Sequence, residues 1–210
     1  MIKLLVADDH ALIRRGIIQT VADEPDMRVI GEAQDVQQLL DLARATDWDL
    51  TILDINMPGR NGIEALKEVK KEYPTRPVLM LSMHPEEHFA VRAFRAGAAG
   101  YLTKESPPEE LITAIRKVLA GGRYVSHALT ETIVREFAFG SDPPLYELLS
   151  NREYEVFRLL ASGRTVSEIA GQLALSVKTV STYRTRVLEK LNLKNNAELM
   201  RYAVEHQFIL

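Results

Sequence analysis

Short apolar runs alternate with amphipathic stretches through the first 120 residues, and this alternation constrains the fold more than any other feature. It predicts five strands, at residues 2–7, 29–30, 50–53, 78–81 and 100–102, and five helices, at residues 11–22, 36–45, 63–69, 88–94 and 111–119. A β-α repeat of this kind forms a parallel sheet with helices on both faces. Ligands then gather at the carboxyl ends of the strands.

From Leu149 onwards the pattern is helical only. Three helix starts have an N-cap oxygen followed three residues later by a glutamate: Ser150 with Glu153, Thr165 with Glu168, and Asn195 with Glu198. Gly163 ends the first helix, and Ser176 caps the third, which is predicted at residues 177–191. The segment therefore predicts four helices. The short turn before Ser176 gives the second and third helices the layout of a helix-turn-helix.

Gly121 and Gly122 end the last helix of the first segment, and the breaker run Gly140-Ser141-Asp142-Pro143-Pro144 follows after one short helix predicted at residues 130–139. We therefore predict one domain at residues 1–120, a linker at residues 121–148 and a second domain at residues 149–210.

Composition excludes several classes of protein. With 46% hydrophobic residues in 210, the chain can fill the cores of two small domains and is not intrinsically disordered. It has no cysteine, which excludes disulfides, thiolate metal sites and cysteine nucleophiles and fits a reducing compartment. No apolar run approaches the roughly 20 residues of a membrane span, and the run before Asp8 is too short for a signal peptide. We expect a cytoplasmic protein with no membrane partner.

Charge is divided unevenly between the two segments. Residues 149–210 carry nine Lys and Arg against six Asp and Glu, a net charge of +3, whereas residues 1–148 carry 17 against 23. Two domains with different partners would show this difference. The basic excess alone fits an ordinary solvated surface of a four-helix module as well as it fits DNA binding.

Five polar residues fall at the ends of four predicted strands. Asp8 and Asp9 follow the first strand and Asp54 closes the third, so a sheet with these strands adjacent brings three carboxylates to one edge. Their repulsion requires protonation or a hard divalent cation. Lys104 and Ser82, at the fifth and fourth strand ends, would add a cation and a hydroxyl. Each residue has an ordinary explanation as a turn, a strand end or a surface ion pair, but the complete set favours a functional site.

With the stretch from Asp54 to Gly62, these residues resemble the receiver domain of two-component response regulators, which has a doubly wound, flavodoxin-like sheet. The resemblance covers residues 1–120. It implies that Asp54 accepts a phosphoryl group from a histidine kinase or phosphotransfer protein. It also implies a Mg²⁺ cofactor held by Asp9, Asp54, the main-chain carbonyl of Asn56 and, through water, Asp8. Phosphoryl transfer needs charge neutralisation, which Mg²⁺ and Lys104 would supply.

The resemblance also implies a switch. Ser82 would donate its hydroxyl to a phosphoryl oxygen, and Tyr101 would turn inward as Ser82 moves. Glu105 follows Lys104 where many receivers have a proline, often after a cis bond, and the sequence leaves the geometry of this bond open.

His10 and His84 come near the pocket in the sequence. Neither has a partner at metal-ligand spacing, so we expect neither to bind the metal.

The second segment resembles the LuxR-type helix-turn-helix domain over residues 149–206. The resemblance rests on residues 149–153, on residues 170–176 and on Val177-Lys178-Thr179-Val180. A receiver followed by such a domain is the arrangement of the NarL/FixJ family of transcription regulators. Ser181-Thr182-Tyr183-Arg184 resembles the members that act in virulence and secondary-metabolism control. The implied partners are double-stranded promoter DNA with repeated half-sites, RNA polymerase, and a second copy of the chain paired through residues 197–206.

The helix predicted at residues 177–191 has a packed side with Val180, Val187 and Leu191 and a polar side opposite. We expect the polar side to meet DNA, with Ser181, Thr182 and Thr185 at base edges, as the family resemblance implies, and with Lys178, Thr179 and Arg186 at phosphates. Arg184 flanks the packed side, where it could reach a phosphate or lie along its own helix.

Two other classes of function fit parts of the sequence. A haloacid-dehalogenase-like phosphatase also forms an aspartyl phosphate on a parallel sheet, but it needs a second aspartate two residues after the nucleophile. That position is Asn56 here, so the general acid is missing. A pure interaction relay would pass on phosphate without touching DNA, and DNA binding by residues 149–210 alone would exclude it. We expect no enzyme activity beyond the chain's own phosphorylation and dephosphorylation.

Overall fold

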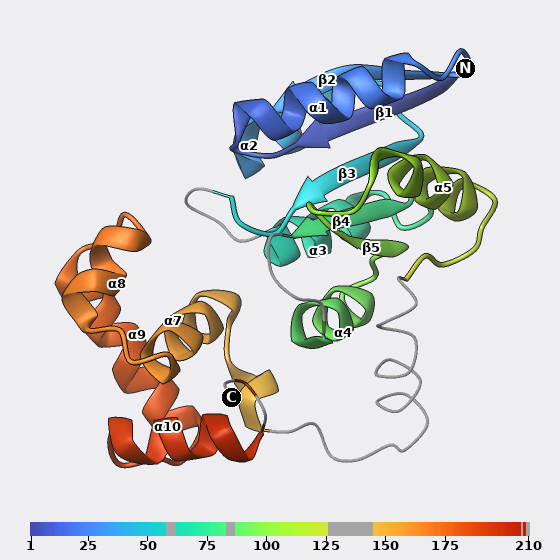
Figure 1. The fold of residues 1–210 in the computed structure, drawn as a ribbon. Coiled ribbons are helices and arrows are strands. Elements are labelled where there is room, and N and C mark those ends of the chain that lie inside the picture. Colours follow the sequence, from blue (N-terminus) through green and yellow to red (C-terminus); the bar gives the residue numbers. More distant parts are fainter. Residues whose placement is uncertain (58–61, 83–86, 126–144, 207, 209–210) are drawn as a thin grey trace. The chain divides into compact units, whose positions relative to one another are not determined.

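The computed structural model describes residues 1–57, 62–82, 87–125, 145–206 and 208. The chain divides into two compact units, Met1–Gly140 and Ser141–Leu210 (Figure 1). The short helix predicted at residues 130–139 lies outside the described residues. Among the helices that are described, none has the length and apolar character that crossing a membrane requires.

The first unit is built on a parallel sheet of five strands: β1 (Ile2–Ala7), β2 (Met27–Ala33), β3 (Leu50–Asp54), β4 (Val78–Ser82) and β5 (Gly100–Thr103). Their order is β2-β1-β3-β4-β5, with each neighbouring pair parallel. The first and third strands are adjacent, as predicted from the acidic residues at their ends. Every residue of the central strands β3 and β4 is buried, which is why both sequences are mainly apolar.

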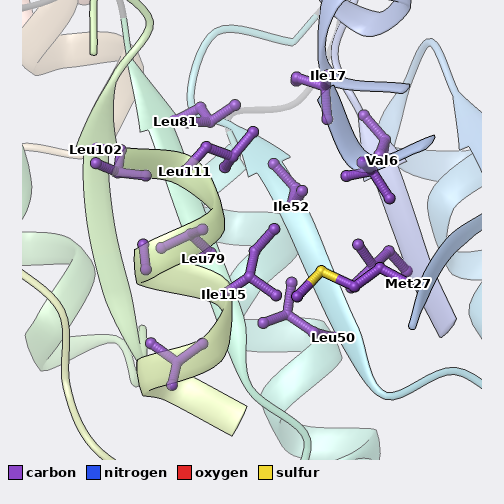
Figure 2. Close-up of a cluster of buried hydrophobic side chains, with 14 residues drawn as sticks. Val6, Ile17, Met27, Leu50, Ile52, Leu79, Leu81, Leu102, Leu111 and Ile115 are labelled. Carbon is purple, nitrogen blue, oxygen red and sulfur yellow. The ribbon is translucent and has the colours of Figure 1, made fainter. Parts of the chain in front are cut away.

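The helices of this unit are α1 (Ala11–Ala22), α2 (Val36–Ala45), α3 (Gly62–Glu72), α4 (Glu87–Arg95) and α5 (Pro108–Leu119). Ile17 of α1 and Leu111 and Ile115 of α5 pack on one face of the sheet, against residues that include Val6 and Ile52 (Figure 2). On the other side, α2 contacts β1, α3 contacts β3 and α4 contacts β5. The unit is therefore the doubly wound fold that the β-α alternation predicts.

Several elements are longer than predicted, among them β2, α3 and α5. The edge strand β2 extends beyond residues 29–30. Its full length was not predicted because only its two terminal residues are buried, so its sequence lacks a long apolar run. Its pairing with β1 also shifts register between Leu4 and Leu5. Helix α5 begins at Pro108 instead of residue 111, with Pro107 at the N-cap and two glutamates in the first turn.

The second unit contains a short 3₁₀ helix, η1 (Leu145–Leu148), and four helices, α7 (Asn151–Ala161), α8 (Val166–Gln172), α9 (Val177–Lys190) and α10 (Asn196–Glu205). Both capping boxes predicted for α7 and α8 are present. At the start of α10, Asn195 accepts from the backbone N–H of Glu198, but the Glu198 carboxylate accepts from Lys194 instead of completing a box.

Both ends of the predicted linker pack on the neighbouring unit. Near its start, the main-chain carbonyl of Tyr124 accepts from the backbone N–H of Tyr101 at 3.1 Å, and the Tyr124 N–H donates to Ala99. Near its end, Tyr146 is buried and lies edge-on to Phe208, with ring centroids 4.8 Å apart. Both tyrosines of the predicted linker thus contact residues outside it.

Candidate functional site

The three aspartates at the strand ends lie together with Lys104. The Lys104 Nζ is 2.7 Å from Asp8 Oδ2 and 2.7 Å from Asp54 Oδ2, and all three side chains are almost completely buried. Asp9 is about one-third exposed, so it borders this buried group on the solvent side. The sheet order explains the cluster, because β1 and β3 end side by side.

The environment of Asp54 opposes its ionisation. Burial raises the pKa of Asp54 to about 6, and the negative charge of Asp8 also raises it. Two contacts act in the other direction: the Lys104 ammonium lies on Asp54 Oδ2, and the backbone N–H of Asn56 donates to Oδ1 at 3.1 Å. Both oxygens of this carboxylate are therefore held by the chain in a fixed orientation.

Ser82 and Tyr101 occupy the neighbouring strands and are completely buried. The main-chain carbonyl of Ser82 accepts from the Lys104 N–H at 2.8 Å, so the ends of β4 and β5 are joined at the residue that carries the ammonium. Tyr101 faces inward in this structure. The Lys104–Glu105 bond, whose geometry the sequence left open, is trans.

The donors at this edge suit a hard divalent cation. Ligand atoms of Asp8, Asp9, His10 and Asp54 all lie within 4.8 Å of one another. Three of these groups are carboxylates, the oxygen donors that Mg²⁺ prefers. His10 lies near the pocket, as its position in the sequence predicts. It is the N-cap of α1, and its Nδ1 is 2.6 Å from Asp9 Oδ1 and 3.2 Å from Asp8 Oδ1. His84 lies outside the described residues.

Two further residues of the site carried no signal in the sequence. Gly62 approaches the strand end so closely that a Cβ there would collide with the main-chain carbonyl of Asp54. Its N–H donates to Ile55, which closes the loop after β3. Arg14, on α1, reaches the main-chain carbonyl of Asp8. A glycine after a loop and an arginine in a helix are common, so only the folded contacts distinguish these two.

In the second unit, α9 follows α8 across a tight turn in which Ala174 has a φ of 52°. The predicted packed residues Val180, Val187 and Leu191 are buried. The opposite side of α9 is open to solvent, with five of the seven predicted DNA-contacting residues fully exposed: Lys178, Ser181, Thr182, Thr185 and Arg186. This polar face is the candidate DNA-reading surface.

The other two predicted contacts are engaged within the domain. The Thr179 hydroxyl lies 2.7 Å from the Ser176 hydroxyl at the helix start, where Ser176 also accepts from the Thr179 N–H. The Nε of Arg184 donates to Asn196 Oδ1 at 2.7 Å. Arg184 therefore ties α9 to the first turn of α10, a contact that its sequence position did not predict.

Comparisons with known proteins agree with this architecture. The family model of the response regulator receiver domain matches residues 4–116, and that of the luxR family of bacterial regulatory proteins matches residues 147–203. The response regulator GacA of Pseudomonas aeruginosa is 38% identical over 210 residues, covering 100% of this chain and 98% of the relative. The oxygen regulatory protein NreC of Staphylococcus epidermidis is 36% identical over 217 residues, covering 99% of each chain.

A solved structure of a similar protein is a complex with DNA. RcsB from Salmonella enterica serovar Typhimurium, bound to the promoter rprA in the presence of the phosphomimetic BeF₃⁻, matches with a TM-score of 0.64 and 27% identity. The match covers 96% of this chain and 97% of that chain. With the two family models and relatives of full length, the chain therefore belongs to the NarL/FixJ family of response regulators, the DNA-binding transcription regulators of bacterial two-component systems.

Proposed function

We propose that Asp54 is the phosphoryl acceptor of this regulator and that phosphorylation at this residue controls DNA binding by α9. The observation that carries the proposal is the position of Lys104, whose ammonium bridges the buried carboxylates of Asp8 and Asp54. A buried cation at the acceptor is what an incoming, negatively charged phosphoryl group requires.

In the proposed reaction, a carboxylate oxygen of Asp54 attacks the phosphorus of a phosphohistidine on the kinase or phosphotransfer protein. The O–P bond forms as the P–N bond breaks, and the imidazole leaves with the bond electrons. Lys104 places its charge beside the accepting carboxylate, and the Asn56 N–H keeps that carboxylate oriented. The Ser82 hydroxyl would donate to a phosphoryl oxygen, and Tyr101 would pack behind it. The chain would catalyse only its own phosphorylation and its hydrolytic reversal.

We infer that Mg²⁺ is the metal, held by Asp9, Asp54 and the Asn56 carbonyl, with Asp8 acting through water. When bound, Mg²⁺ supplies positive charge to the phosphoryl oxygens. An indirect role for Asp8 is supported by its existing contacts, because Lys104 lies on its Oδ2 and the His10 N–H donates to its Oδ1. Asp9 borders solvent, where a hydrated cation would enter.

The output would be promoter DNA read by α9 in the major groove. We propose that two copies of the chain bind repeated half-sites through a contact that includes α10, and that RNA polymerase is the target of regulation.

The packing of Tyr124 and Tyr146 favours a receiver domain ending near residue 125 and a DNA-binding domain starting near residue 145.

Phosphorylation by acetyl phosphate tests the proposal directly. With Mg²⁺ present, the native protein should gain one phosphoryl group and bind promoter DNA more tightly. Asp54→Asn should do neither, whereas Asp41→Asn, at an exposed position of α2, should behave as native. Equal labelling of the native protein and Asp54→Asn would exclude Asp54 as the acceptor. Equal DNA affinity with and without the label would exclude the proposed control.

A further inference from the structure

Arg14 occupies a position in α1 that would ordinarily be apolar. The buried residues of this helix are Arg14, Ile17 and Val21, which share the face that packs on the sheet. Arg14 is only 7% exposed. A guanidinium in such a place loses its hydration and is retained only where specific hydrogen bonds replace the lost water.

The partners of Arg14 place it behind the metal site. Its Nη1 donates to the main-chain carbonyl of Asp8 at 2.8 Å, and its Nε lies 3.4 Å from Glu32 Oε2 on β2. The Asp8 carbonyl belongs to the peptide group that joins Asp8 to Asp9. Because a peptide group is planar, holding this one oxygen restrains the orientation of the plane that contains the Cα atoms of both aspartates.

We propose that Arg14 is a positioning residue for the metal site, which sets the orientation of the Asp8–Asp9 peptide without contacting the metal. This inference rests on the proposed function, in which these two aspartates hold Mg²⁺. The guanidinium bonds to the main chain and leaves the carboxylate oxygens available, whereas Lys104 occupies Oδ2 of Asp8. The ring and backbone N–H of His10 hold Asp8 Oδ1 from the other side. Arg14 thus holds the main chain at Asp8, whereas Lys104 and His10 hold its carboxylate.

Methionine at position 14 should separate this role from folding. Its side chain is of similar length and suits the apolar face with Ile17 and Val21, and replacing a buried ion by an apolar group is often neutral for stability. Glu32 is half exposed, so it remains hydrated without its partner. The peptide between Asp8 and Asp9 would lose its anchor, and we expect the protein to remain folded with weakened Mg²⁺ binding.

The experiment is titration of the full-length, metal-free protein with Mg²⁺ by calorimetry, and with Mn²⁺ by loss of the free-ion EPR signal. Arg14→Met should raise the Kd for both ions by about 10- to 100-fold, the usual effect of losing a group that orients metal ligands. Two controls match it. Arg15→Met removes the same charge from an exposed position, and Ile17→Val loosens the same buried face without touching Asp8. Both should keep the native Kd.

The outcomes distinguish this inference from the proposed function. If the native protein binds neither ion, or if Asp9→Asn binds both as tightly as native, the metal site itself is wrong. If the site binds and Arg14→Met has the native Kd, or if either control weakens binding equally, the role of Arg14 is wrong. Should Arg14→Met fail to fold, Arg14→Lys decides, because it keeps the charge but lacks the planar donor group. A folded Arg14→Lys with the native Kd would overturn the role of the guanidinium, and a raised Kd would support it.

Discussion

The ammonium of Lys104 and the carboxylate of Asp54 form an ion pair at 2.7 Å between groups that are 1% and 0% exposed. The same ammonium reaches Asp8, so a single lysine compensates two buried carboxylates. This arrangement affects both the stability of the receiver domain and the chemistry that we propose for it.

The first prediction is that Asp54 destabilises the metal-free protein at neutral pH. Its pKa is about 6 in the folded protein against 3.8 as its ordinary value, so the folded state binds the proton more tightly than the unfolded state. The resulting stabilisation is complete at pH values below the ordinary pKa and is lost as the pH rises through about 6. Asp54→Asn should thus raise the free energy of unfolding at pH 8 by up to about 3 kcal/mol, and by much less at pH 4.

Urea unfolding of the native protein and Asp54→Asn in EDTA measures this difference. Arg116 lowers the pKa of Asp26 and Lys3 lowers the pKa of Asp47, so these carboxylates make the protein more stable as the pH rises. Both proteins contain them, so their contributions cancel in the comparison. A difference that does not change between pH 4 and pH 8 would contradict the prediction. Mg²⁺ should stabilise the native protein and have little effect on the variant.

The second prediction concerns Lys104→Met. Removing the ammonium leaves Asp8 and Asp54 buried and facing each other, so the free energy of unfolding in EDTA at pH 8 should fall by about 3 to 5 kcal/mol. The loss should shrink at pH 5, where Asp54 can bind a proton. Adding Asp54→Asn in the same chain should restore most of the stability. If the double variant is as unstable as Lys104→Met, the lysine acts through packing instead of charge.

The third prediction is that Thr182 and Thr185 read bases as hydrogen-bond acceptors. Their hydroxyls donate to the carbonyls of Lys178 and Ser181 within α9, at 3.0 and 3.1 Å, which leaves the oxygen lone pairs and the methyl groups for DNA. Thr182→Val keeps the shape and removes the acceptor. The variant should therefore lose about 1 to 3 kcal/mol of binding free energy on DNA sites that place an adenine or cytosine amino group opposite residue 182. On other sites its affinity should change little. Binding selection on randomised half-sites would show an unchanged preference if this assignment is wrong.

Lys178→Ala provides the contrasting case for the same helix. The exposed Lys178 should contact phosphate, so its loss should weaken binding about equally on all sequences. The slope of log affinity against log salt should decrease by about one unit. Titration of one specific and one unrelated duplex at several salt concentrations measures both effects, and a sequence-dependent loss would place Lys178 at a base edge instead.

The fourth prediction separates Arg184 from Arg186. Because Arg184 donates to Asn196, Arg184→Ala should lower the free energy of unfolding of the DNA-binding domain by about 1.5 to 3 kcal/mol. In the double variant, Asn196→Ala should cause little further loss of stability. Arg186→Ala, at an exposed position, should leave stability unchanged and weaken DNA binding. Chemical unfolding with a double-mutant cycle checks the pair. Additive losses would show that the two side chains are not coupled.

The sequence by itself determined the order and type of the strands and α-helices in the described residues, whereas the 3₁₀ helix η1 was not predicted. Apolar runs and helical stretches are local patterns, and the N-caps Ser150, Thr165 and Ser176 satisfy their own helix starts, so each could be recognised within a few residues of chain. The acidic edge also followed from the sequence, because parallel strands in adjacent positions must end at the same side of the sheet. The elements could be predicted because they depend on residues close together in the chain. The acidic edge could be predicted because a parallel α/β sheet has few alternative topologies.

Only the tertiary structure decided which residues meet between different elements. Arg14 reaches the Asp8 carbonyl and Arg184 bonds to Asn196, although nothing in their local sequence distinguishes them from an ordinary helical arginine or a DNA-contacting cation. The close approach of Gly62 to Asp54 is likewise visible only in the fold. The partner of a long side chain is set by which elements pack against its own, and the burial of that contact sets how much it stabilises. Both quantities arise from the packed fold and have no counterpart in the local pattern of the chain.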